Sequence, residues 1–168
     1  GEEQPRVPVD NTLHCFDVPS NTWSSIDDAD SPPPPPRVGH ASAALNGKLY
    51  VFGGRTSIEM GEGLIADLHC YDPLSKKWNI VQTTGEAPSA RCYHAMTSDD
   101  TSIYLFGGCT KDRLNDLYRF DPETRIWHQL PTCSDIRGRG GPGLVAVGGK
   151  VYVIAGFIGE EVDDMFVY

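Results

Sequence analysis

A repeat with a period close to 50 residues constrains this chain more than any other feature of its sequence. Its three tryptophans, Trp23, Trp78 and Trp127, are separated by 55 and then 49 residues. An aromatic–aspartate pair precedes each tryptophan at the same two intervals: Phe16-Asp17, Tyr71-Asp72 and Phe120-Asp121. Self-similarity at such a period indicates one small structural unit that is stacked several times along the chain.

Glycines that end apolar runs keep the same period. Residues 50–54 and 104–108 both end an apolar run in Gly-Gly, and residues 152–156 are a weaker third copy. Arg37-x-x-His40 likewise recurs 54 residues later as Arg91-x-x-His94. Helical periodicity is absent, and the 18 glycines and 13 prolines supply many turns. The period is typical of Kelch repeats, so the sequence predicts an all-β, Kelch-type β-propeller.

Each unit is expected to form four short strands. In the second unit these are residues 40–45, 48–52 and 67–71 and a strand around Trp78, with a hairpin turn at Asn46-Gly47. The tryptophans are expected to be buried between blades. The unit boundaries divide the chain into residues 1–31, 32–84, 85–133 and 134–168. This division gives thirteen strands, or 3.25 blades, so the chain is expected to be a propeller segment that the remaining blades of the same chain complete.

Charge and the length of apolar runs exclude nucleic acid and membranes as partners, and the cysteine content indicates the compartment. The net charge of −9 provides no basic patch for nucleic acid, and no apolar run reaches the roughly 20 residues of a membrane helix. Five cysteines without a Cys-x-x-Cys motif favour a reducing compartment, here the cytoplasm with the nucleus as an alternative. His14-Cys15 and His69-Cys70 resemble paired metal ligands, but they occupy equivalent positions of different units, which the ring holds apart.

The candidate site is defined by arginines near the glycine pairs. Arg55 follows Gly54 directly, and a fixed guanidinium in a concave site suits an anionic group such as a sulfate or carboxylate. Arg91 and Tyr93 open the third unit, and Arg139 lies in a glycine-rich stretch that lacks the histidine of the earlier units. These four residues are the predicted substrate-binding residues. The alternative is that the arginines only join neighbouring blades.

At these residues the chain resembles the plant nitrile-specifier and epithiospecifier proteins. The matching stretches lie outside the general Kelch pattern: residues 1–2, 5–11, 50–55, 137–144, 156–157 and 159–164. The resemblance implies a six-bladed propeller that uses ferrous iron to divert the sulfated aglycone of glucosinolates to nitriles, epithionitriles or thiocyanates. It also implies that Arg55 faces the sulfate and that Arg91 and Tyr93 lie beside the site.

One departure from that family concerns the metal. The resemblance implies iron ligands in a Glu-x-x-x-Asp-x-x-x-His motif of the following blade. Glu160 and Asp164 have the first spacing, but residue 168 is Tyr168 and not histidine. No metal site is therefore expected in this segment, and ligands for ferrous iron are expected beyond residue 168. Two classes stay open, an iron-dependent specifier activity and a non-catalytic Kelch scaffold that binds another protein.

Overall fold

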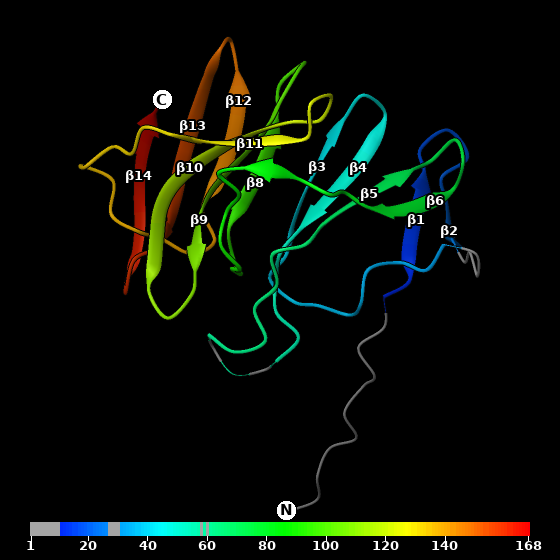
Figure 1. Cartoon of the computed structure of the whole chain (residues 1–168), viewed down its shortest axis with the longest axis horizontal. Helices are drawn as coiled ribbons and strands as arrows, with labels where there is room; N and C mark the ends of the chain where they lie inside the picture. Colours follow the sequence, from blue (N-terminus) through cyan, green and yellow to red (C-terminus); the bar gives the residue numbers. More distant parts are fainter. Residues whose placement is uncertain (1–10, 27–30, 58, 60) are drawn as a thin grey trace, which may run out of the picture.

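The computed structural model describes residues 11–26, 31–57, 59 and 61–168; the part of the resemblance in residues 1–10 lies outside them. The described residues form fourteen strands and no helix, in four separate sheets of two, four, five and three strands. The sheets follow one another along the chain, as the colours of Figure 1 show. This arrangement confirms the all-β class and is that of a partial β-propeller. No helix long and apolar enough to cross a membrane occurs among the described residues.

We call the sheets blades one to four in chain order. Blade one holds β1 (Leu13–Asp17) and β2 (Thr22–Ile26). Blade two holds β3 (Ala41–Leu45), β4 (Lys48–Phe52), β5 (Leu68–Asp72) and β6 (Lys77–Ile80). Blade three holds β7 (Thr84–Gly85), β8 (Ala95–Ser98), β9 (Ile103–Cys109), β10 (Arg113–Asp121) and β11 (Ile126–Leu130). Blade four holds β12 (Gly143–Val147), β13 (Lys150–Phe157) and β14 (Glu161–Val167).

Tight hairpins connect the first two strands of blades two and four. Asn46 and Gly47 have φ of 52° and 71°, and Gly148 and Gly149 have φ of 61° and 72°. Two successive residues with positive φ match the right-handed twist of the strands they join. The turn expected at Asn46-Gly47 is therefore confirmed. In both blades each strand pairs antiparallel with the next one along the chain.

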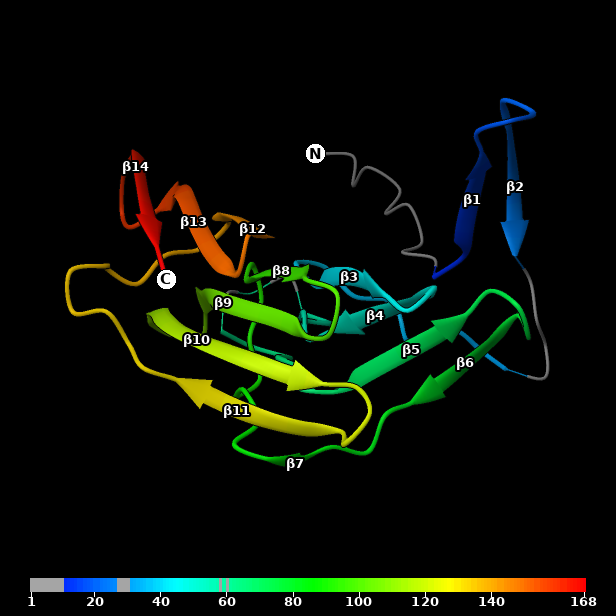
Figure 2. The same ribbon diagram turned by 90° about the horizontal axis from the view of Figure 1, so that it is seen from above.

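Blade three contains one strand more than expected. β7 comes from the segment that connects blades two and three, and it pairs in parallel with the outermost strand, β11, beside which it lies in Figure 2. Gly85 has φ of 80°, and a Cβ there would lie 2.3 Å from the Trp127 carbonyl oxygen, so only glycine allows this approach. The connector protects an edge that would otherwise expose unpaired backbone groups. It carries no apolar run, which is why the repeat pattern gave thirteen strands.

The core lies between the blades. β8 packs between β3 and β12, the first strands of the neighbouring blades (Figure 2). Trp127 is 1% exposed and packs on Phe52 of blade two and on Phe120 of its own blade. The expectation of a tryptophan buried between blades is therefore confirmed for Trp127. It is wrong for Trp23, which is 71% exposed, and Trp78 is only half-buried, because no described strand covers it as β4 covers Trp127.

Candidate functional site

Three arginines make the same set of bonds in three consecutive blades. Arg37, Arg91 and Arg139 precede β3, β8 and β12 of blades two, three and four, 54 and 48 residues apart. Each holds an aspartate of its own blade through both terminal nitrogens: Asp67, Asp116 and Asp164 respectively. We call these three pairs the arginine clasps.

The clasp of Arg91 shows how completely the guanidinium is used. Its Nη1 and Nη2 lie 2.6 and 2.9 Å from the two Asp116 carboxylate oxygens. Nη1 also donates to the Gly107 carbonyl oxygen at 3.0 Å, and Nε donates to the Ser89 carbonyl oxygen at 3.1 Å. The Arg91 side chain is 1% exposed and lies over the Tyr118 ring. The side chain therefore fastens the entry segment, β9 and β10 of one blade together.

The main chain at the same arginines bonds to the preceding blade. The Arg91 carbonyl oxygen accepts from Gly54 N at 2.9 Å, and the Arg139 carbonyl oxygen accepts from Gly108 N at 2.8 Å. The clasps of Arg91 and Arg139 therefore each join two blades, with the backbone bonded to one and the side chain to the other. Burial raises the pKa of Asp67, but the hydrogen bonds from Arg37 and His69 outweigh this effect and hold the pKa below its usual value. The Asp67 carboxylate is thus kept ionised, as its ion pair with Arg37 requires.

This geometry places two of the four predicted site residues. Arg91 and Arg139 are both 1% exposed and occupied by Asp116 and Asp164, as expected if arginines join neighbouring blades. Binding of substrate by these two side chains stays a prediction. The recurrence of Arg37, Arg91 and Arg139 with the period of the repeat was the signal for a shared structural role.

A chain of backbone hydrogen bonds links blades two to four just before β3, β8 and β12 begin. Tyr93 N donates to the Gly39 carbonyl oxygen, and Gly141 N donates to the Tyr93 carbonyl oxygen, both at 2.7 Å. These three residues are equivalent in the repeat, and all have positive φ, of 69°, 54° and 61° in chain order. Two of them are glycines, as this conformation favours, and the third is Tyr93. The loops after β4, β9 and β13 emerge at the same end of the blades.

Arg55 and Tyr93 meet at this end. The Arg55 backbone pairs with Val38 on one side and with Leu64 on the other. Its side chain is mostly buried, and Nη2 donates to the Tyr93 hydroxyl oxygen at 3.1 Å. The guanidinium carbon lies 5.5 Å from the centre of the Tyr93 ring. The structure therefore brings together the other two predicted site residues, one from each of two adjacent blades.

A cysteine thiol, that of Cys92, lies near this arginine. Cys92 and Cys109 are cross-strand partners, joined by backbone hydrogen bonds of 3.0 and 2.7 Å, and all five cysteines of the chain are free. Burial raises the pKa of the Cys92 thiol, and the nearby Cys109 adds to this, while Arg55 opposes it. Burial also raises the pKa of Cys109, and Arg113 opposes it. Both groups stay protonated near neutral pH, so neither is an activated nucleophile.

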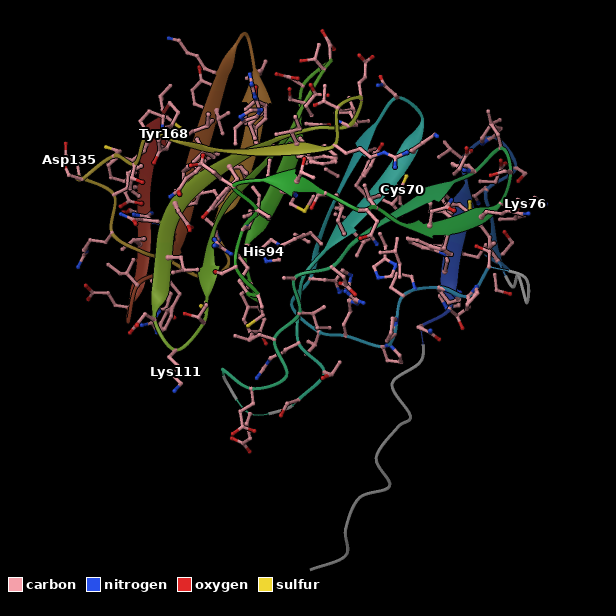
Figure 3. All side chains as sticks on the ribbon, viewed as in Figure 1. Cys70, Lys76, His94, Lys111, Asp135 and Tyr168 are labelled. Carbon is pink, nitrogen blue, oxygen red and sulfur yellow. The ribbon has the colours of Figure 1, made fainter. Side chains whose placement is uncertain are left out.

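Sequence reasoning missed a second cation at this end. Arg113 starts β10 and lies over the Phe157 ring, with its guanidinium carbon 4.7 Å from the ring centre. Arg113, Cys109 and Lys111 border a small hollow of about 110 Å³ at the β9–β10 turn, where Figure 3 labels Lys111. Phe157 and Cys109 are the repeat counterparts of Arg55. The sequence signal for this region was the position of Arg55, Cys109 and Phe157, at which each blade carries a different residue type.

The described residues do not fit a metal centre. No group of three or more histidine, cysteine, aspartate or glutamate side chains among them could hold a metal ion. Of the acidic cluster after Gly159, Asp164 is used by Arg139, while Glu160 and Glu161 are exposed. The hydrogen bond from Arg139 lowers the pKa of Asp164.

Comparison with known proteins defines the family. The Kelch-repeats domain of KLHDC2, KLHL20 and DRC7 matches residues 1–168, so the chain belongs to the Kelch-repeat proteins. Among its relatives is the N-(sulfonatooxy)prop-2-enimidothioate sulfolyase of Thlaspi arvense, 36% identical over 94% of this chain and 47% of that protein. The chain thus spans about half the length of that relative.

Other relatives carry different names. Kelch domain-containing protein 1 of Mus musculus is 35% identical over 71% of this chain and 30% of that protein. The Rab9 effector protein with kelch motifs of Homo sapiens is 37% identical over 63% of this chain and 28% of that protein. The resemblance to plant specifier proteins is therefore confirmed as a family relation, alongside Kelch proteins of other kinds.

Proposed function

We propose that this chain supplies the anion-binding part of a specifier-type Kelch protein, which diverts a sulfated glucosinolate aglycone to nitrile-type products. The observation that supports this most directly is Arg55, a mostly buried guanidinium that the repeat itself does not require. The sulfolyase of Thlaspi arvense, named for an N-sulfonatooxy imidothioate, supports a sulfate ester as the ligand. Ferrous iron belongs to the proposal as a cofactor whose ligands lie beyond residue 168.

Arg55 binds the sulfate group in this proposal. A guanidinium presents its N–H donors in a plane that matches two oxyanion oxygens, and its burial strengthens the attraction. The Arg55 backbone is held by blade two on both sides, so the charge sits at a fixed place. As the sulfate leaves the aglycone, negative charge grows on its oxygens, and a guanidinium fixed beside them stabilises that charge. Arg113 lies near Cys109, whose backbone partner Cys92 lies near Arg55, and it adds positive charge to the same end of the blades.

The test compares product outcome in variants of the full-length protein. Allyl glucosinolate is hydrolysed by a thioglucosidase with ferrous iron present, and nitrile and isothiocyanate are quantified by gas chromatography. Arg55→Ala is expected to lose nitrile formation, since losing one partner of a desolvated charged contact costs about 2–5 kcal/mol of binding. Arg55→Lys restores only part of it, because the planar fork is lost. Arg119→Ala removes an exposed arginine of β10 and serves as the control. Undiminished nitrile formation by a folded Arg55→Ala protein contradicts the proposal.

A protein-binding scaffold is the second candidate. The relative named a Rab9 effector supports it, because that name refers to a protein partner. The exposed loops after β4 and β9 are the surface such a partner would contact. If Arg55→Ala leaves binding of a short alkyl sulfate unchanged while Lys111→Glu abolishes capture of a defined protein partner, the scaffold function replaces the first proposal.

A further inference from the structure

We propose that Tyr93 is a positioning residue, which holds the Arg55 guanidinium in the orientation that binds the anion. This inference deepens the proposed function and rests on it. It assigns Tyr93 a role that acts through Arg55, rather than contact with the ligand alone.

The backbone of Tyr93 gives the first reason. Its φ of 54° lies in the left-handed region, where residues other than glycine are strained. The equivalent residues Gly39 and Gly141 make the same kind of inter-blade backbone bond without a side chain. The fold therefore needs only glycine here. Strain that the fold does not need is typical of functional positions, so the side chain is what the position provides.

The side chain of Tyr93 gives the second reason. It contacts the guanidinium in two ways, through the hydroxyl at 3.1 Å and through the ring face at 5.5 Å. The ring in turn rests on Gly39, where an added Cβ would lie 3.2 Å from two ring carbons. An arginine side chain has several rotatable bonds, so a fixed backbone alone does not fix its charge. A two-point contact with a supported ring orders the guanidinium before the ligand arrives, and such preorganisation improves binding.

Two substitutions separate the two contacts. Tyr93→Phe keeps the ring and loses the hydroxyl, and Tyr93→Gly loses both while restoring the residue type of the neighbouring blades. We expect Tyr93→Phe to weaken binding of a short alkyl sulfate to the full-length protein about three- to tenfold, the usual range for one hydrogen bond. Tyr93→Gly weakens it further, while its Tm is equal to or above that of the wild type, because backbone strain is relieved. Affinity is measured by isothermal titration calorimetry.

Ala155→Gly is the matched control. Ala155 has φ of 54° and stands where the repeat has Gly53 and Gly107, so its replacement relieves the same kind of strain. It is expected to leave alkyl sulfate affinity unchanged. If Ala155→Gly lowers that affinity as much as Tyr93→Gly does, the effect belongs to backbone flexibility and the proposal is overturned.

A double-mutant cycle shows whether Tyr93 acts through Arg55. The effect of Tyr93→Phe is expected to disappear in an Arg55→Lys background, in which weakened binding is still measurable and the hydrogen bond to the hydroxyl is altered. An unchanged effect in that background means that Tyr93 contacts the ligand independently and overturns the inference. An affinity that Tyr93→Phe does not alter also overturns it. If Arg55→Ala itself leaves binding intact, the proposed function fails, and this outcome is distinct from failure of the Tyr93 role alone.

Discussion

Two kinds of buried arginine lie at the same end of the blades, and they differ in how they recur along the chain and in what their guanidinium groups bind. Arg91 repeats in the neighbouring blades as Arg37 and Arg139, and its guanidinium is bound to a carboxylate of its own blade. Arg55 has Cys109 and Phe157 as counterparts, and its guanidinium contacts a tyrosine of the next blade. Residues that recur with the period build the propeller, whereas in the proposed function the residues that depart from it bind the ligand.

Removing a clasp is expected to have the largest effect. Arg91→Ala leaves the Asp116 carboxylate, only 18% exposed, without its partner, and should lower the free energy of unfolding by about 3 kcal/mol or more. Urea denaturation of the full-length protein measures this, with Arg119→Ala within about 0.5 kcal/mol of wild type as the control. Replacing both partners by leucine should cost less than Arg91→Ala, because no charge is left buried. A loss below about 1 kcal/mol for Arg91→Ala would contradict the structural role of the arginine clasps.

The pH dependence of stability tests whether water is excluded from the interior around the arginine clasps. His94 lies three residues after Arg91, inside the molecule in Figure 3, and packs on the Phe52 ring. Burial, followed by the charge of Arg91, lowers the pKa of His94 from 6.5 to about 3. Between these values the unfolded chain binds a proton that the folded chain does not. The free energy of unfolding is therefore not reduced by His94 above pH 6.5. It falls by about 1.4 kcal/mol per pH unit as the pH drops from 6.5 toward 3.

His94→Gln isolates that contribution. The difference in unfolding free energy between wild type and His94→Gln should shift in favour of the variant as the pH falls from 6 to 4, because glutamine does not titrate. His128→Gln, which changes an exposed histidine of β11, should leave the slope unchanged. Parallel pH profiles for wild type and His94→Gln would mean that water reaches this region in solution.

The smallest effect on stability is expected from Arg55. Arg55→Ala removes the hydrogen bond to Tyr93 and leaves the backbone pairing with Val38 intact, so it should cost about 1 kcal/mol of unfolding free energy. The same urea experiment checks this value against the loss for Arg91→Ala. An equal or larger loss for Arg55→Ala would show that Arg55 is as structural as the clasps.

The sequence predicted the class of fold well because the markers of the repeat are the residues that build each blade. Glycine pairs, hairpin turns and Trp127 all have the roles that their spacing indicated. β7 was missed because its pairing depends on one glycine, Gly85, next to a carbonyl of another strand. The half-buried state of Trp78 depends on which strands face it, and no pattern within its own unit records that.

The candidate site was predicted in part for the same reason. Arg55 was identified because it directly follows a glycine pair of the repeat, and the structure places Tyr93 against it. Arg91 and Arg139 were grouped with it on charge and position, although their spacing equals that of Asp116 and Asp164, which are their ion-pair partners. Arg113 was missed because the departure from the repeat that signals this contact lies at its partner Phe157, in the next blade.

One variant tests directly whether departures from the repeat make the ligand site. Arg55→Cys combined with Tyr93→Gly gives blade two and blade three the residue types that Cys109 and Gly141 provide elsewhere. In the full-length protein, the free energy of unfolding of this double variant should lie within about 1 kcal/mol of the wild-type value. The relief of backbone strain at residue 93 offsets the loss of one hydrogen bond. Isothermal titration with a short alkyl sulfate should then show no binding. Wild-type affinity in the folded double variant would contradict the account, and so would a stability loss as large as that of Arg91→Ala.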